Sequence, residues 1–308
     1  MRLLPALLAL AACSEPAPPA PVPAAPQDHL LDLPPAPDGP AAFTPPGRDE
    51  IPEGPFGDAV RRGRAAFTDT AAQAGPYMGN TLSCSNCHLD EGRRPDSAPM
   101  WAAWGQYPAF RKKNDRVNTM EDRLLGCFTY SLNAQDSETG GPPPRGSQVL
   151  TDLQAYLFWL AQGTPTGRAL PGRGYPALEA PPQPPDVGRG QQVFAERCAV
   201  CHGEDGQGAQ AEGQDVFPPL WGPRSFNWGA GMHRVNTAAG FIQANMPLGQ
   251  PGSLTVQQAW DVAQFIGAQP RPADPRAAEA GAGTDARFHD HDCLYGETVD
   301  GHRLGEGG

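Results

Sequence analysis

Four of the seven cysteines lie in two copies of one short motif, CSNCH at 84–88 and CAVCH at 198–202. The spacing C-x-x-C-H is the attachment signature of a c-type haem, in which both thiols bond to the porphyrin and the histidine binds the iron. A single CxxC could be a redox dithiol or half of a zinc site, but two complete motifs predict two covalently bound haem c groups. The expected attachment and iron-binding residues are Cys84, Cys87 and His88 for haem 1, and Cys198, Cys201 and His202 for haem 2.

The sixth ligand of the haem 2 iron has several candidates. Met246, in the segment NMP, follows His202 by 44 residues and precedes a predicted helix. Small cytochromes c place an axial methionine in this setting, so we favour Met246. Met232 and His233 are rivals, and Met246 could instead be a methionine of the core.

For haem 1, spacing does not choose among the candidate ligands, which are Met100, Met120, Cys127, Lys112 and Lys113. Five basic residues fall within 13 positions, in RKKNDR at 111–116 and at Arg123, although the net charge of the chain is −11. Such a cluster could be a solvated face. Beside an otherwise unexplained cysteine, it predicts a pocket that attracts and orients a small anion. The acidic balance of the whole chain argues against a nucleic acid partner.

Cys293 lies in the segment HDHDCLYGE near the end of the chain. A disulfide between Cys293 and Cys127 is the alternative to a functional role for Cys127, because an exported chain can form disulfides. Cys293 could also remain a free thiol.

Four segments with helical periodicity must position these residues, at 57–67, 147–163, 186–202 and 254–269. In the second, four leucines form a stripe, Ser147 can cap the start and Gly163 can end the helix. Each CxxCH motif follows one helix and a later helix closes each unit, which indicates a weak internal duplication. Glycine and proline number 37 each, and no alternating strand pattern is found. We expect a mainly α, loop-rich fold with two class I cytochrome c-like domains in tandem.

The first residues have the layout of a bacterial export signal. MRLLPALLALAAC carries one arginine and a short apolar run, and LAAC resembles a lipobox in which Cys13 is lipidated. An ordinary signal peptide is the alternative. We expect a periplasmic protein anchored by lipid to the inner or outer bacterial membrane. The expected layout is a signal at 1–13, a Pro/Ala-rich linker at 14–50, cytochrome c domains at 51–164 and 186–271 joined by a linker at 165–185, and a tail at 272–308.

Seven segments together resemble the dihaem thiosulfate dehydrogenase family, whose first domain is also similar to the haem subunit of the Sox system. The segments are GNTLSCSNCHL (79–89), YPAF (107–110), EDRLLGCF (121–128), CAVCHGEDGQG (198–208), PPLWG (218–222), NWGAGM (227–232) and NMPLG (245–249). The resemblance covers roughly residues 77–272. It implies that Cys127 is the axial ligand of haem 1 and that Arg123 binds substrate. A second family arginine falls near Lys113, so this chain has lysine there or uses Arg111 instead.

The resemblance implies an enzyme that joins two thiosulfate ions into tetrathionate, with the reverse reaction also open. Cys127 would leave the iron and bond to a thiosulfate sulfur, and a second thiosulfate would attack this adduct. Electrons would pass from haem 1 to haem 2 and then to a small soluble acceptor, such as a cytochrome c. Two other classes remain open, a non-catalytic dihaem electron carrier and a dihaem peroxidase.

Overall fold

The computed structural model describes residues 43–211, 213–280, 287–299 and 301–305. The predicted export signal with Cys13, and the predicted linker up to residue 42, lie outside these ranges. Residues 43–50, assigned to the linker from sequence, pack on the first domain, because the rings of Phe43 and Trp101 lie 5.6 Å apart. The short helix η2 (Arg48–Glu50) follows. Among the described residues, no helix has the length and apolar character needed to cross a bilayer.

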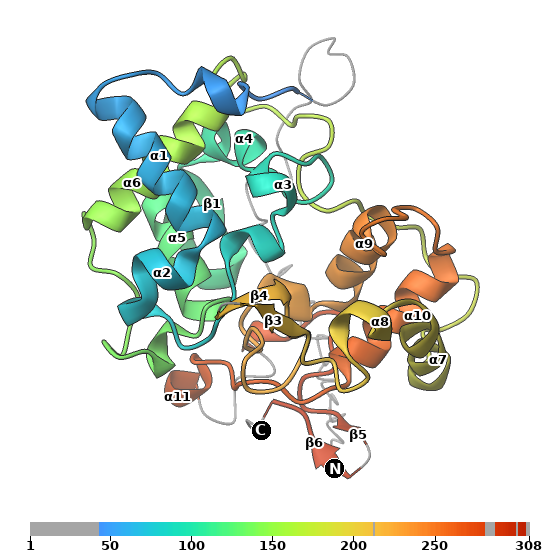
Figure 1. The fold of residues 1–308 in the computed structure, drawn as a ribbon. Coiled ribbons are helices and arrows are strands. Elements are labelled where there is room, and N and C mark those ends of the chain that lie inside the picture. The colour runs from blue at the N-terminus through green and yellow to red at the C-terminus, as the bar shows by residue number, and fades with distance from the viewer. Residues whose placement is uncertain (1–42, 212, 281–286, 300, 306–308) are drawn as a thin grey trace, which may run out of the picture.

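Two crossing helices, α1 (Pro55–Thr68) and α6 (Gln148–Leu160), form the frame of the first domain (Figure 1). Gly63 permits the close approach, because a Cβ atom there would lie 2.0 Å from the carbonyl oxygen of Asp152. The predicted leucine stripe of α6 is confirmed as a fully buried face. Its members are Leu150, Leu153, Leu157 and Leu160.

The second domain repeats this crossing with α7 (Val187–Arg197) and α10 (Val256–Gly267). Here a Cβ atom at Gly190 would lie 2.0 Å from the carbonyl oxygen of Asp261. In both domains an arginine just before the glycine donates two hydrogen bonds to the same buried aspartate. The predicted duplication is therefore visible as one repeated helix crossing.

Shorter helices and loops complete each domain. In the first domain they are α2 (Thr70–Ala74), η3 (Gly75–Tyr77), η4 (Cys84–Asn86), α3 (Leu89–Gly92), α4 (Met100–Ala103), η5 (Trp104–Gln106), η6 (Lys112–Asn114), α5 (Met120–Tyr130) and η7 (Ala134–Asp136). In the second domain they are α8 (Ala199–His202), η8 (Gly231–His233) and α9 (Val235–Asn245).

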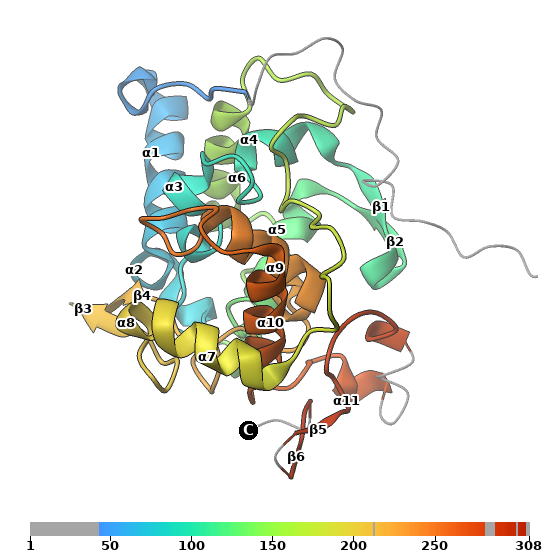
Figure 2. The same cartoon turned by 90° about the vertical axis from the view of Figure 1, so that its right-hand side faces the viewer.

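The described residues also contain three short antiparallel strand pairs, which the sequence did not predict. Each strand has only two to four residues, too few to produce the alternating pattern by which a strand is recognised. Figure 2 shows one pair at the edge of the first domain and another in the tail near α11 (Ala277–Ala280). The pairs are β1 (Ala109–Arg111) with β2 (Arg116–Asn118), β3 (Ala209–Ala211) with β4 (Gln214–Phe217), and β5 (Thr298–Val299) with β6 (His302–Arg303).

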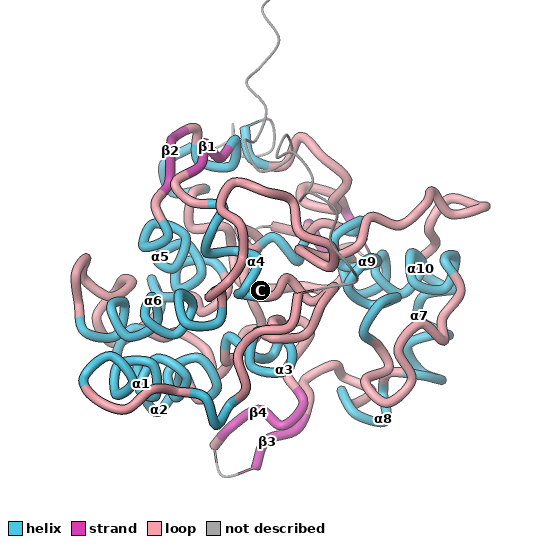
Figure 3. The backbone as a smooth tube through the Cα atoms, turned by 90° about the horizontal axis from the view of Figure 1, so that it is seen from above, coloured by secondary structure: helices cyan, strands magenta, loops and turns pink. Residues whose placement is uncertain are grey.

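The two domains lie side by side, with loop segments between them (Figure 3). Part of the predicted linker at 165–185 packs into this region, because Asp96 N and Ala98 N donate to the carbonyl oxygens of Gly172 and Gly174, both at 2.7 Å. The connecting segment therefore forms part of the wall around the first haem motif.

Candidate active site

The first CxxCH motif borders a cavity of about 470 Å³ that is lined mainly by the first domain and is called the haem 1 cavity below. Both motif thiols, the imidazole of His88 and Cys127 line this one cavity. Most of the remaining lining is apolar and includes three methionines, which are Met100, Met120 and Met232. The residues therefore fit a covalently attached haem, and Cys127 lies with two of the rival ligands predicted from sequence.

Both motif histidines are held in the orientation that a metal ligand requires. His88 Nδ1 lies 2.8 Å from the carbonyl oxygen of Ala98, and His202 Nδ1 lies 3.0 Å from that of Pro218. The second ring nitrogen is thereby directed away from the backbone, as in most metal-binding histidines. Burial lowers the pKa of His88 to about 4 and also lowers that of His202. Both rings are neutral at pH 7 and can bind iron.

Helix α5 places Arg123 and Cys127 on one face. The helix starts with a capping box, in which the Thr119 side chain accepts from Asp122 N at 3.1 Å and the Asp122 carboxylate accepts from Thr119 N at 2.9 Å. Residues four positions apart then face the same way. Arg123 Nη1 donates to Cys127 Sγ at 3.2 Å, and the negative charge of a Cys127 thiolate raises the pKa of Arg123.

A second cavity of about 690 Å³ adjoins the first, since Arg111 and Arg123 line both. Its lining carries seven basic side chains and only two carboxylates. A cavity of this charge favours small polyvalent anions. The basic residues are Arg111, Lys112, Lys113, Arg123, Arg234, Arg276 and Arg287; this group is called the basic cavity below.

Sequence reasoning identified only part of the basic cavity. Arg234 comes from the second domain, and Arg276 and Arg287 come from the tail. Because all three are far along the chain from residues 111–123, no local motif indicated that they line the same cavity. Arg116 belonged to the predicted cluster, but the cavity lining does not include it, and its Nη2 instead lies 3.3 Å from Asp122 Oδ1.

Lys113 is the most buried amine of the basic cavity. Its Nζ donates to the carbonyl oxygen of Gly229 at 2.5 Å and lies 3.9 Å above the centre of the Tyr130 ring. Burial lowers the pKa of Lys113 well below the usual lysine range, and the charges of Arg123 and Arg276 lower it further. An anion in the cavity would relieve this repulsion.

Two tyrosines that line the haem 1 cavity were not identified from the sequence. Tyr107 OH accepts a hydrogen bond from Arg111 Nη1 at 2.7 Å and thereby orients the guanidinium. Tyr175, from the segment predicted to be a linker, lines the haem 1 cavity. Nothing in the Pro/Gly-rich sequence around Tyr175 indicated this position.

In the second domain, Met246 packs against the same hydrophobic cluster as Cys198. Met232 packs against this cluster as well, and it also lines the haem 1 cavity. His233 forms a close group with side chains of the tail. Met246 therefore remains the predicted ligand of the haem 2 iron, with Met232 as its rival.

The alternative disulfide between Cys127 and Cys293 is wrong in this structure, since both thiols are unbridged. Cys127 faces Arg123, whereas Cys293 Sγ lies 3.6 Å from His289 Nδ1. The two sulfur atoms therefore belong to different sites.

Comparison with known families defines the class of protein. Residues 70–166 match the family described as SoxA/TsdA, cytochrome c domain, and residues 187–269 match the family Cytochrome c. The molecule is a tandem of two cytochrome c domains, mainly helical and rich in loops, which confirms the predicted fold class.

The chain is 50% identical over 272 residues to the thiosulfate dehydrogenase of Stutzerimonas stutzeri (strain A1501), which covers 87% of each chain. It is 51% identical over 267 residues to the thiosulfate dehydrogenase of Thiomonas intermedia (strain K12), covering 86% of this chain and 83% of the relative.

A solved structure of thiosulfate dehydrogenase from Marichromatium purpuratum, in its "as isolated" form, superposes with a TM-score of 0.84 at 55% identity. The match covers 86% of this chain and 58% of that longer chain. The chain belongs to the thiosulfate dehydrogenase family, and it carries two covalently bound haem c groups.

Proposed function

We propose that the protein oxidises two thiosulfate ions to one tetrathionate, with release of two electrons. The observation that carries this proposal is the contact between Arg123 and Cys127, at 3.2 Å, where the haem 1 cavity meets the basic cavity. A sulfur atom that can bond to thiosulfate thus lies beside cations that can hold this dianion. Family membership supports the same reaction.

Cys127 would hold the haem 1 iron together with His88, and its sulfur is the proposed atom that bonds to substrate. Its thiolate joins the terminal sulfur of the first thiosulfate, and two electrons are released. The sulfur of a second thiosulfate then attacks this adduct, so that tetrathionate leaves and the Cys127 thiolate is restored. Arg123, Arg111 and Lys113 hold the two anions against their mutual repulsion.

When bound, the two haems would supply the redox chemistry, and the final electron acceptor would be a small soluble protein such as a cytochrome c. We assign His88 and Cys127 to the haem 1 iron, and His202 and Met246 to the haem 2 iron. A thiolate ligand would lower the potential of haem 1 and a methionine ligand would raise that of haem 2, so electron transfer from haem 1 to haem 2 would be favourable. Met246→Gly should change the spectrum and potential of haem 2, and an unchanged spectrum would remove this assignment.

The decisive test of the reaction is the variant Cys127→Gly, assayed with thiosulfate and an artificial electron acceptor. We expect no tetrathionate formation, while haem staining still shows two covalent haems. Thr151→Gly, on the exposed face of α6, controls for the loss of a side chain in a helix and should keep its activity. Full activity of Cys127→Gly would contradict the proposed mechanism, and a wild-type protein without thiosulfate-dependent acceptor reduction would favour a plain electron carrier.

We also propose that the protein is exported, lipidated at Cys13 and held at the periplasmic side of a bacterial membrane. The support is the apolar run before LAAC and the Pro/Ala-rich segment that follows it. In the host, Cys13→Ala should move the protein from the membrane fraction to the soluble fraction, and an unchanged distribution would exclude a lipid anchor. The proposed domain limits remain 51–164 and 186–271, with the linker at 165–185 and the tail from 272.

A further inference from the structure

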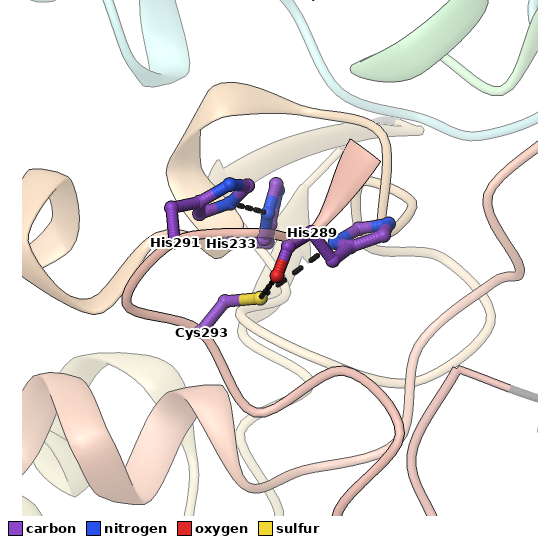
Figure 4. A group of neighbouring side chains, drawn as sticks. All are labelled: His233, His289, His291 and Cys293. Carbon is purple, nitrogen blue, oxygen red and sulfur yellow. Dashed lines mark hydrogen bonds between the residues drawn. The ribbon is translucent and has the colours of Figure 1, made fainter. Parts of the chain in front are cut away.

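Four side chains that the proposed reaction does not use form a compact group between the second domain and the tail (Figure 4). His233 comes from η8, and His289, His291 and Cys293 come from the tail. Each offers one ligand atom, and these four atoms all lie within 4.8 Å of one another. His233 and His289 are buried, and the other two are partly buried.

Two of the histidines have one ring nitrogen engaged outside the group. The Nδ1 atom of His233 pairs with the carbonyl oxygen of Ala230. The Nε2 atom of His289 lies 3.0 Å from the carboxylate of Asp274, whose side chain is 0% exposed. A carbonyl or carboxylate partner on the far nitrogen is the usual arrangement for a metal-binding histidine, because it fixes the tautomer and the ring orientation.

The other nitrogen of each ring faces the group. His233 Nε2 lies 2.8 Å from His291 Nε2, and His289 Nδ1 lies 3.6 Å from Cys293 Sγ. Tetrahedral coordination by zinc separates two nitrogen ligands by about 3.4 Å and a nitrogen from a sulfur by about 3.6 Å. To enclose an ion, the two nearest nitrogens would have to separate by about 0.6 Å, and ligand atoms as far apart as 4.8 Å would have to approach by about 1.2–1.4 Å.

We propose that His233, His289, His291 and Cys293 bind one zinc ion. Three imidazoles and one thiolate give the four nitrogen and sulfur ligands typical of a closed, structural zinc site. This site is separate from both CxxCH motifs, and its assignment does not depend on the proposed reaction.

The zinc ion would tie residues 289–293 of the tail to His233 of the second domain. Asp274, which orients His289, also forms an ion pair with Arg276 at 2.5 Å. Arg276, His233 and His291 all line the basic cavity. The proposed ion would thus fix the tail segment that supplies a cation to this cavity.

The test starts from the full-length protein with both haems attached, purified in buffers freed of trace metals after growth with added zinc. Elemental analysis should find about one zinc ion for every two haem irons. X-ray absorption at the zinc edge, which the haems do not obscure, should show nitrogen ligands at about 2.0–2.1 Å and one sulfur at about 2.3 Å.

Two variants and one control assign the ligands. Cys293→Ser should remove the sulfur contribution from the zinc-edge spectrum, and His291→Ala should lower the zinc content severalfold. His302→Ala changes an exposed histidine of the same tail, so its zinc content should equal that of the wild type. If either ligand variant fails to fold, the zinc-edge spectrum of the wild-type protein still tests the proposed zinc site.

Wild-type protein that contains no zinc and does not take up stoichiometric zinc would overturn the proposal. So would bound zinc without a sulfur ligand, or a site that retains copper instead of zinc under these conditions. Equal loss of zinc from His302→Ala would likewise show that the ion is held elsewhere.

Discussion

At the scale of single residues, the basic side chains around Cys127 differ in what they contact. Arg123 donates a hydrogen bond to Cys127 Sγ, Arg111 donates one to the Tyr107 hydroxyl, and the half-buried Lys113 lies over the Tyr130 ring. Lys112 is more exposed and lies 3.5 Å from the carboxylate of Asp290. Equal charge therefore does not mean an equal role.

Arg123→Lys should lower kcat/KM for thiosulfate more than the unchanged charge would suggest. Lysine lacks the planar fork of donors and cannot hold both Cys127 and an anion in the same geometry. A hydrogen bond to a charged group contributes about 1.5–3 kcal/mol, so the expected loss is roughly ten- to hundredfold. Steady-state kinetics test this, with Arg116→Lys at the exposed Arg116 as the matched control. Equal kinetics for the two variants would contradict a specific role for Arg123.

Lys113 predicts a pH dependence of substrate binding. Its pKa is lowered by burial and by the nearby arginines, so the ammonium is charged below this lowered pKa and neutral above it. As pH rises through the lowered value, one positive charge is lost and KM for thiosulfate should rise. Lys113→Arg keeps its charge and should flatten the profile, whereas Lys112→Arg should retain the wild-type profile. A wild-type slope in Lys113→Arg would show that another group titrates.

The local part of the site could be predicted from sequence and the remote part could not. The CxxCH motifs, Arg123 and Cys127 lie in short segments whose spacing carries the chemistry. Arg276 and the group around Cys293 are brought to the site by the path of the tail. A local sequence pattern does not predict such contacts, because they depend on how elements far apart in the sequence pack together.

At the scale of elements, the two domains rely on the same helix crossing. Gly63 and Gly190 each face the carbonyl oxygen of a buried aspartate on the closing helix. The aspartates, Asp152 and Asp261, each accept two hydrogen bonds from an arginine. Close backbone approach and a fixed ion pair together set where the helices cross.

Gly63→Ala and Gly190→Ala should therefore each destabilise the protein. The new Cβ atom would meet a backbone oxygen at 2.0 Å, and overpacking of this kind costs about 1–3 kcal/mol. Chemical unfolding followed by circular dichroism measures the change. Gly141→Ala is the control, since a Cβ atom there would meet nothing within 4 Å. A midpoint equal to that of the wild type for Gly63→Ala would contradict the crossing geometry.

The main helices were predictable because each buries a long periodic face. The segment at 147–163 became α6, although the side chain of Ser147 makes no capping hydrogen bond, contrary to the prediction. Asp186 caps α7 by accepting from Arg189 N at 2.8 Å. The short strand pairs and the packed segment around Tyr175 were missed. Their conformation is set by contacts with the domains rather than by a local pattern.

At the scale of the whole molecule, polar contacts join the two domains. Asn133 Nδ2 donates to the Ser225 carbonyl oxygen at 2.8 Å, and Thr81 Oγ1 donates to Asp215 at 2.6 Å. The Asn133 hydrogen bond is buried and the Thr81 hydrogen bond is partly buried, and such bonds are costly to break. The domains should therefore unfold together. The same contacts keep the haem 1 cavity and the basic cavity adjacent in the folded protein.

Asn227 is the sharpest test of this coupling, because it is 0% exposed and lies where the second domain meets α5. Its Nδ2 donates to the Thr129 carbonyl oxygen at 3.0 Å, and its Oδ1 accepts from Gly229 N at 2.9 Å. The carbonyl oxygen of Gly229 in turn accepts from Lys113.

Asn227→Ala leaves buried groups unpaired, at a cost of roughly 1–3 kcal/mol, and frees the loop that positions Lys113. We expect a lower Tm with a single transition, together with a raised KM for thiosulfate. Asn236→Ala, at an exposed position on α9, should change neither quantity. Two separate unfolding transitions, or a lower Tm with unchanged KM, would show that the domains do not position the basic cavity jointly.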